Sequence, residues 1–113
     1  MTRKITIAAA QYPLDALKSL AEYEAKITRW VEEAVGQGAE LLVFPEYGAM
    51  ELAAITGNAG DVSASFDAVS ALAPETDRLH GALAAKHGVA IVSGSGPQRR
   101  PSCTPNTAHI FGP

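Results

Sequence analysis

The sequence predicts an α/β fold in which short apolar strands alternate with longer helices. Apolar runs of strand length stand at residues 4–11, 41–44 and 89–93. The stretches between them carry apolar residues at helical spacing. Strands that alternate with helices are joined by crossover connections, which make the sheet mostly parallel.

Residues 4–11 (KITIAAAQ) form the first expected strand, led by two β-branched isoleucines and buried on both faces. A helix is expected from Pro13, because proline is tolerated in a first helical turn. Gly36 and Gly38 are expected to end that helix. Its buried stripe is predicted to contain Leu17, Leu20, Ile27, Val31 and Val35. The charged residues predicted to face solvent are Glu22, Lys26, Arg29 and Glu33.

The second strand, residues 41–44 (LLVF), is expected to stop at Pro45, because proline cannot donate a hydrogen bond to a strand ladder. A short helix is predicted over residues 50–55. Glycine, asparagine and aspartate are frequent in residues 56–63, which indicates a loop.

Two helical segments are expected next, at residues 65–72 and 74–87. Their common stripe is predicted to contain Leu72, Thr76, Leu79 and Leu83. The third strand follows at residues 89–93, then a Pro/Gly-rich loop at 94–105 and a fourth strand at 106–111. The predicted order is therefore β-α-β-α-β-β, with the last strand able to pair antiparallel with the third at the sheet edge.

The composition is that of a globular protein of 113 residues, with 47% hydrophobic and 19% charged residues. The net charge of −3 argues against a nucleic-acid partner. One cysteine excludes an internal disulfide and a Cys-rich zinc site. No apolar run approaches the ~20 residues of a membrane span, and the N-terminal run is too short for a signal peptide. A cytoplasmic protein without a membrane partner is expected.

The tripeptide Phe44-Pro45-Glu46 carries the clearest indication of chemistry. Ligands of open α/β sheets bind outside the carboxyl ends of the strands, where Glu46 would lie. A carboxylate fixed there by a rigid strand and a proline is placed to act as a general base. On spacing alone, Glu46 can equally cap the following short helix or face solvent.

Three ordered features carry a family resemblance. They are the strand ending in Ala-Gln at residues 7–11, the run into Phe-Pro-Glu at residues 41–47, and the strand VAIVSG at 89–94 with Asn106-Thr107-Ala108 after it. In this order and spacing the chain resembles the carbon–nitrogen hydrolase (nitrilase) superfamily over essentially its whole length.

The resemblance implies an αββα sandwich, assembled as a homodimer or higher homo-oligomer through its helical face. It also implies hydrolysis of a small-molecule amide, nitrile or carbamoyl C–N bond by a Glu-Lys-Cys set, without metal or cofactor. Glu46 matches the position of the base. The family's lysine and cysteine come later than residue 113, so residues 1–113 are expected to be the N-terminal portion of one domain and inactive alone.

The cysteine and the lysines of this chain do not match the family's catalytic cysteine and lysine. Cys103 stands in a loop between Pro101 and Pro105 with no apolar strand before it, which favours a free thiol. The lysines expected at a strand start or in helical stretches are Lys4, Lys18, Lys26 and Lys86. A non-catalytic α/β binding module and a truncated pseudoenzyme are the alternative functions.

Other motifs are weaker. Gly94, Gly96 and Pro97 lack the Gly-Lys-Ser/Thr that a phosphate loop needs. The histidines, which show no metal-ligand spacing, are His80, His87 and His109. Tyr47 and Met50 follow Glu46 and either line a substrate pocket or pack into the core.

Overall fold

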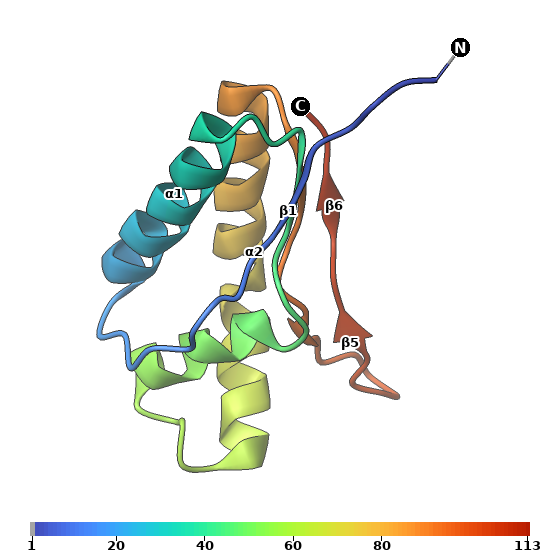
Figure 1. Cartoon of the computed structure of the whole chain (residues 1–113). Helices are drawn as coiled ribbons and strands as arrows, with labels where there is room; N and C mark the ends of the chain where they lie inside the picture. Colours follow the sequence, from blue (N-terminus) through green and yellow to red (C-terminus); the bar gives the residue numbers. More distant parts are fainter. Residues whose placement is uncertain (1) are drawn as a thin grey trace.

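The computed structural model describes residues 2–113, which fold into a four-stranded sheet with helices packed against one face (Figure 1). The sheet order is β1 (Ile7–Ala9), β2 (Leu41–Val43), β3 (Ala90–Val92) and β6 (Ile110–Phe111). β1, β2 and β3 are parallel, and β6 is antiparallel to β3 at the edge. The predicted α/β class, the parallel strands and the antiparallel edge pair are confirmed.

A second, two-stranded sheet corrects the prediction for residues 94–111. β4 (Gly96–Pro97) lies inside the expected loop, and it pairs antiparallel with β5 (Asn106–Thr107). The single strand expected at residues 106–111 is therefore two strands, β5 and β6, with different partners. The register of the β3–β6 pair and that of the β4–β5 pair differ by one residue. Two residues, Gly94 and Ser95, therefore stand opposite the single residue Ala108. This is a β-bulge, which bends the strand and divides it.

Helix α1 (Leu20–Gly36) begins later than predicted. Ser19 caps it, with its hydroxyl accepting a hydrogen bond from the Glu22 backbone N–H at 3.1 Å. The expected start at Pro13 is wrong, because the chain around Asp15 is bound to another segment and cannot enter the helix. Four residues form the buried face of α1: Tyr23, Lys26, Ile27 and Val31.

Helix α2 (Val62–His87) is one continuous helix where two segments were predicted. Pro74 lies inside it and removes one backbone hydrogen bond. Val69 and Leu83 are buried on either side of the proline, so both halves pack on the same core and the helix continues. A 3₁₀ helix, η1 (Gly48–Thr56), replaces the short helix expected at 50–55. Within residues 2–113, no helix combines the length and apolar character that a bilayer crossing requires.

A buried charged cluster corrects the expectation that Lys26 faces solvent. Lys26 is 4% exposed and its ammonium pairs with the Glu51 carboxylate, whose side chain is fully buried. The same ammonium lies 2.7 Å from Asp15 Oδ2 and 2.5 Å from the Pro13 carbonyl oxygen. Tyr12 donates its hydroxyl proton to Glu51 Oε1. The cluster thereby joins α1, η1 and the segment after β1.

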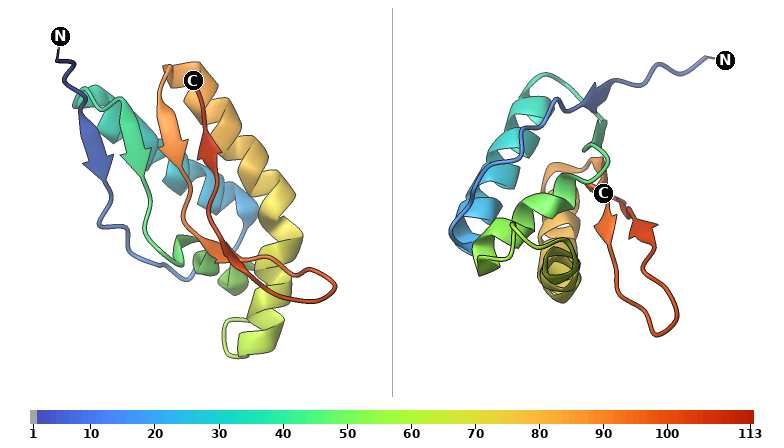
Figure 2. Two further views of the ribbon diagram at one scale, coloured as in Figure 1. Left: turned by 90° about the vertical axis from the view of Figure 1, so that its right-hand side faces the viewer. Right: turned by 90° about the horizontal axis from the view of Figure 1, so that it is seen from below.

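The sheet face opposite the helices carries apolar side chains at the surface. Ile7 is 55% exposed and Ile110 is 75% exposed. Figure 2 (left) shows this face with both helices behind the strands. In the part of the chain described here, helices cover one face of the first strand, and the cover expected on its second face is not supplied by these residues.

The loops after β2 and β3 touch through two glycines. A Cβ at Gly94 would lie 2.9 Å from Gly48 Cα and 3.1 Å from the Gly48 carbonyl carbon, both of them backbone atoms. Only a glycine pair allows this approach, which locks the two loops together at the carboxyl ends of their strands.

The Lys26 cluster gives a first prediction. Lys26→Met keeps the length of the side chain and leaves Glu51 as a buried, less compensated charge. We expect a loss of about 3–5 kcal/mol in the free energy of unfolding, measured by urea denaturation. Lys18→Met, on the exposed side of the same region, is the control and should change stability by less than about 0.5 kcal/mol. An unchanged Lys26→Met protein would contradict a structural role for the pair.

The glycine contact gives a second prediction. Gly94→Ala forces the loops after β2 and β3 apart, because the added Cβ would overlap backbone atoms of Gly48 instead of a flexible side chain. The free energy of unfolding should fall by about 1–3 kcal/mol. Gly36→Ala, whose added Cβ meets no atom within 4 Å, should be neutral or stabilising by up to about 1 kcal/mol. Equal stabilities for the two variants in the same urea titration would show that the contact is dispensable.

Candidate active site

The candidate site stands where β2 and β3 leave the sheet. Phe44 extends the parallel ladder by one more hydrogen bond, from its N–H to the Val92 carbonyl at 3.0 Å. Pro45 and Glu46 then turn out of the sheet, beside the bulge that follows β3. This is the edge at which open α/β sheets bind ligands.

Ser95, in the bulge, fixes the backbone on both sides of Glu46. Its hydroxyl accepts a hydrogen bond from the Tyr47 N–H at 2.8 Å. Its own N–H donates to the Pro45 carbonyl at 3.3 Å, and its carbonyl accepts from the Ala49 N–H at 3.2 Å. Ser95 is a residue of the site that was not predicted from the sequence. A single polar residue between two glycines of a loop was the available indication of a close backbone contact.

Tyr47 adopts a left-handed conformation, with φ of 56°. A bulky residue in this region costs about 1–3 kcal/mol and persists only where surrounding contacts impose it. Here the hydrogen bond from its N–H to Ser95 imposes it. Backbone strain of this kind concentrates at functional sites, and it directly follows Glu46.

The carboxylate of Glu46 is exposed and has one described hydrogen-bond partner. Asn106 Nδ2 donates to Glu46 Oε1 over 3.4 Å, from the first residue of β5. The alternative that Glu46 caps the following helix is not what the structure shows, because Tyr47 precedes η1 and no side chain caps it. The carboxylate is thus held at the surface by a neighbour 60 residues later in the chain.

Aromatic side chains pack in the core next to the site. The Phe44 ring is buried and meets the rings of Tyr12 and His80 edge-on, at centroid distances of 5.5 and 6.0 Å. Burial lowers the pKa of His80, against the opposing effect of the hydrogen bond between its Nδ1 and the Thr76 carbonyl. The His80 ring is therefore neutral at neutral pH and is part of the packed support.

The other candidates named from the sequence lie apart from this arrangement. Cys103 is exposed, in the turn where its carbonyl accepts a hydrogen bond from the Arg100 N–H at 2.9 Å. Lys26 is bound in its buried pair. Tyr47 is 44% exposed, and Met50 packs against the core. The exposed lysines are Lys4, Lys18 and Lys86.

Among the described residues, Glu46 belongs neither to a metal centre nor to the groove between β1 and α1. Across residues 2–113, no three His, Cys, Asp or Glu side chains gather closely enough to hold a metal ion. A groove of about 440 Å³ lies between β1 and α1 and is lined by residues that include Ile7 and Trp30, but not Glu46. In this part of the chain the carboxylate is reached directly from solvent.

The chain was compared with known proteins. The carbon-nitrogen hydrolase family matches residues 6–113. Two solved structures are similar at 26% identity and a TM-score of 0.54, an amidase from Nesterenkonia sp. and the NitN amidase from Neterenkonia sp. AN1. Each alignment covers 96% of this chain but only 38% and 40% of the amidase chains.

No protein in the curated set matches significantly. The chain spans about two fifths of the length of the amidases that it resembles. The family match, in contrast, covers nearly all of its residues and includes the strands, the turn at Glu46 and the bulge at Ser95. This chain belongs to the carbon-nitrogen hydrolase family.

Proposed function

We propose that this chain supplies the general base of an enzyme that hydrolyses the C–N bond of a small amide, nitrile or carbamoyl compound. The observation that carries the proposal is the placement of Glu46 at the carboxyl end of β2, on a strained turn that Ser95 and the glycine contact hold rigid. Family membership and the two similar amidases support the reaction class, with an amide as the first substrate to test.

Glu46 transfers protons in both stages of the proposed reaction, the formation and the hydrolysis of a thioester. It first accepts the proton of a cysteine thiol while the sulfur bonds to the amide carbon, and that proton passes to the leaving nitrogen as the C–N bond breaks. A water molecule then attacks the thioester carbon and gives its proton to Glu46, which passes the proton to the cysteine sulfur as the C–S bond breaks and the carboxylic acid leaves. A carboxylate suits both steps because it alternates between the charged and the protonated form.

The nucleophile and the stabilising lysine of this reaction are proposed to come from outside residues 1–113. Lys26 is unsuited, because its buried ammonium already forms ion pairs with Glu51 and Asp15. Cys103 is unsuited, because it lies in an exposed turn instead of a sharp turn after an apolar strand. Assembly into a homodimer or higher homo-oligomer through the helical face stays a prediction.

Glu46→Gln tests the general base directly. In the natural chain that contains these residues, we expect kcat to fall by about 10²–10⁴-fold, because the amide cannot accept a proton. The measurement is ammonia release from a series of small aliphatic amides, with circular dichroism to verify the fold. Glu32→Gln, an exposed position on α1, is the matched control and should leave turnover unchanged. Retained turnover in Glu46→Gln would reject the assignment.

Cys103→Ser tests the placement of the nucleophile. Because Cys103 is a free surface thiol, the variant should keep kcat/KM within about twofold of the natural chain, far below the loss that removing a nucleophile causes. The 113-residue segment alone should release no ammonia. If Cys103→Ser instead abolishes turnover, Cys103 is the nucleophile, and the proposal that the nucleophile comes from outside residues 1–113 is wrong.

A further inference from the structure

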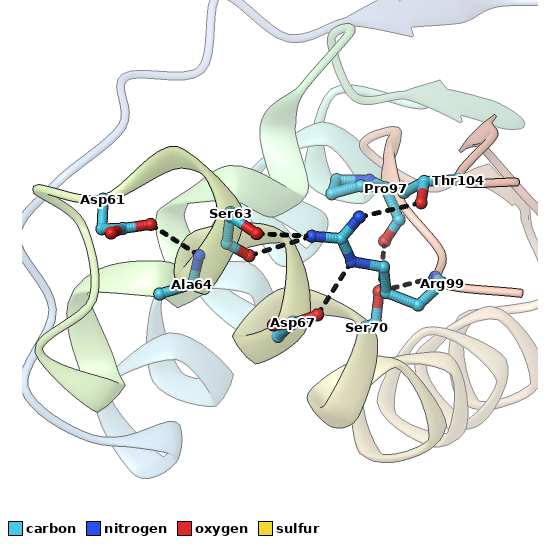
Figure 3. Close-up of polar contacts among 8 residues, drawn as sticks. All are labelled: Asp61, Ser63, Ala64, Asp67, Ser70, Pro97, Arg99 and Thr104. Atoms are coloured by element: carbon cyan, nitrogen blue, oxygen red, sulfur yellow. Dashed lines mark hydrogen bonds and ion pairs between the residues drawn. The ribbon is translucent and has the colours of Figure 1, made fainter.

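The hairpin that carries Asn106 is attached to the first turns of α2 by one arginine. Arg99 follows β4 and extends its guanidinium over α2 (Figure 3). Its Nε lies 2.8 Å from Asp67 Oδ1, and its Nη2 donates to the hydroxyl and the carbonyl of Ser63 at 3.0 and 3.2 Å. The guanidinium also lies 5.5 Å from the centre of the Phe66 ring.

The same guanidinium reaches the segment that leads into β5. Arg99 Nη1 donates to Thr104 Oγ1 at 3.0 Å, two residues before Asn106. Ser70 of α2 adds a second attachment, because its hydroxyl donates to the Pro97 carbonyl at 3.1 Å and accepts from the Arg99 N–H at 2.9 Å. The β4 side of the hairpin is thus bound directly to α2, and the segment before β5 is linked to α2 through Arg99.

This geometry needs an arginine. The five donors of a guanidinium are fixed in one plane, so that a single side chain can bind Asp67, Ser63 and Thr104 together. A lysine ammonium at this position has three donors on a flexible stem and cannot reproduce the fork. Arg100 is the contrasting neighbour: within the described residues, its hydrogen bond is made by the backbone N–H, and its side chain is exposed.

What the attached hairpin presents is the amide of Asn106. β5 pairs with β4 in the register Pro97↔Asn106, so the attachment of Pro97 to α2 and of Thr104 to Arg99 also fixes Asn106. Its Nδ2 contacts only one of the two Glu46 oxygens, Oε1. Donation to Oε1 leaves Oε2 without a hydrogen-bond partner among the described residues.

We propose that Arg99 and Asn106 are positioning residues of the candidate active site. Asn106 orients the Glu46 carboxylate, and Arg99 acts through Asn106 by holding the hairpin on α2. The proposal rests on the proposed function of Glu46. Misplacing a catalytic group by about 1 Å costs on the order of 100-fold in rate, so a loosened hairpin should lower kcat and leave substrate binding nearly unchanged.

The test uses the natural chain that contains these residues and an amide that it hydrolyses. Asn106→Asp preserves the shape of the side chain and removes the donor, and Arg99→Lys preserves charge and removes the fork. Both should lower kcat about tenfold or more while KM changes less than about threefold. Arg100→Lys is the matched control and should match the natural chain. Asp67→Asn, which keeps the shape of the partner side chain, provides a second route to weakening the Arg99 contact.

The double variant separates a relay from two independent effects. If Arg99 acts through Asn106, Arg99→Lys combined with Asn106→Asp should be no slower than Asn106→Asp alone. Multiplied losses would overturn the relay, and an unchanged kcat in either single variant would overturn the role of that residue.

A second readout does not depend on activity. The NMR signals of the Asn106 side-chain amide should shift in Glu46→Gln and in Arg99→Lys but not in Arg100→Lys. If the natural chain hydrolyses no amide, nitrile or carbamoyl compound, the proposed function fails, and these shifts still decide whether Arg99 positions Asn106 against Glu46. Absent shifts in Arg99→Lys would overturn the positioning proposal even in an active enzyme.

Discussion

The buried ion pair between Lys26 and Glu51 is the contact on which the arrangement of this chain depends. Glu51 lies in η1, directly after the turn that carries Glu46, and Lys26 lies on α1. Tyr12 and the backbone N–H of Asp15 bind the same carboxylate, so the segment after β1 is fixed by it as well. Taking two charges out of water costs several kcal/mol per ion, which the pairing offsets only when its geometry is good. The pair therefore defines one arrangement of these segments more than it adds stability.

The candidate site depends on this arrangement and on a close contact between backbones. η1 can begin two residues after Glu46 because neither Gly48 nor Gly94 has a side chain where the two loops meet. The bulge at Gly94 and Ser95 turns the serine toward Tyr47, where it compensates the strained backbone. Bulges recur beside active sites because they redirect one side chain without disturbing the rest of the sheet. The result is a carboxylate held at a defined place on an otherwise exposed surface.

The open face of the sheet and the family match both concern what this chain contributes to the proposed enzyme. Ile7 and Ile110 place apolar surface opposite the helices, and the matched amidases are about two and a half times as long as this chain. The proposed reaction draws its cysteine and lysine from outside the 113 residues. Glu46 and the residues that orient it belong, in contrast, to the chain itself. What the described part contributes to the proposed enzyme is thus a prearranged base.

The sequence by itself determined the three parallel strands, an antiparallel partner at the sheet edge and the position of Glu46 after Phe44 and Pro45. Apolar runs and proline act locally, so their consequences can be derived without knowing the fold. Helix α2 crossing Pro74 and the late start of α1 could not be derived in this way, because packing and a distant carboxylate outweighed local preference.

Only the tertiary structure decided which charges are buried and which residues meet at the site. Lys26 has the spacing of a solvated residue, and nothing near it in the chain indicates that Glu51 lies opposite. The contact of Asn106 with Glu46 spans 60 residues, and that of Arg99 with Asp67 spans 32. Such pairs form because sheet register and helix packing bring distant segments together. Hydrophobic periodicity determines which face of an element is buried, but not which polar group it will meet there.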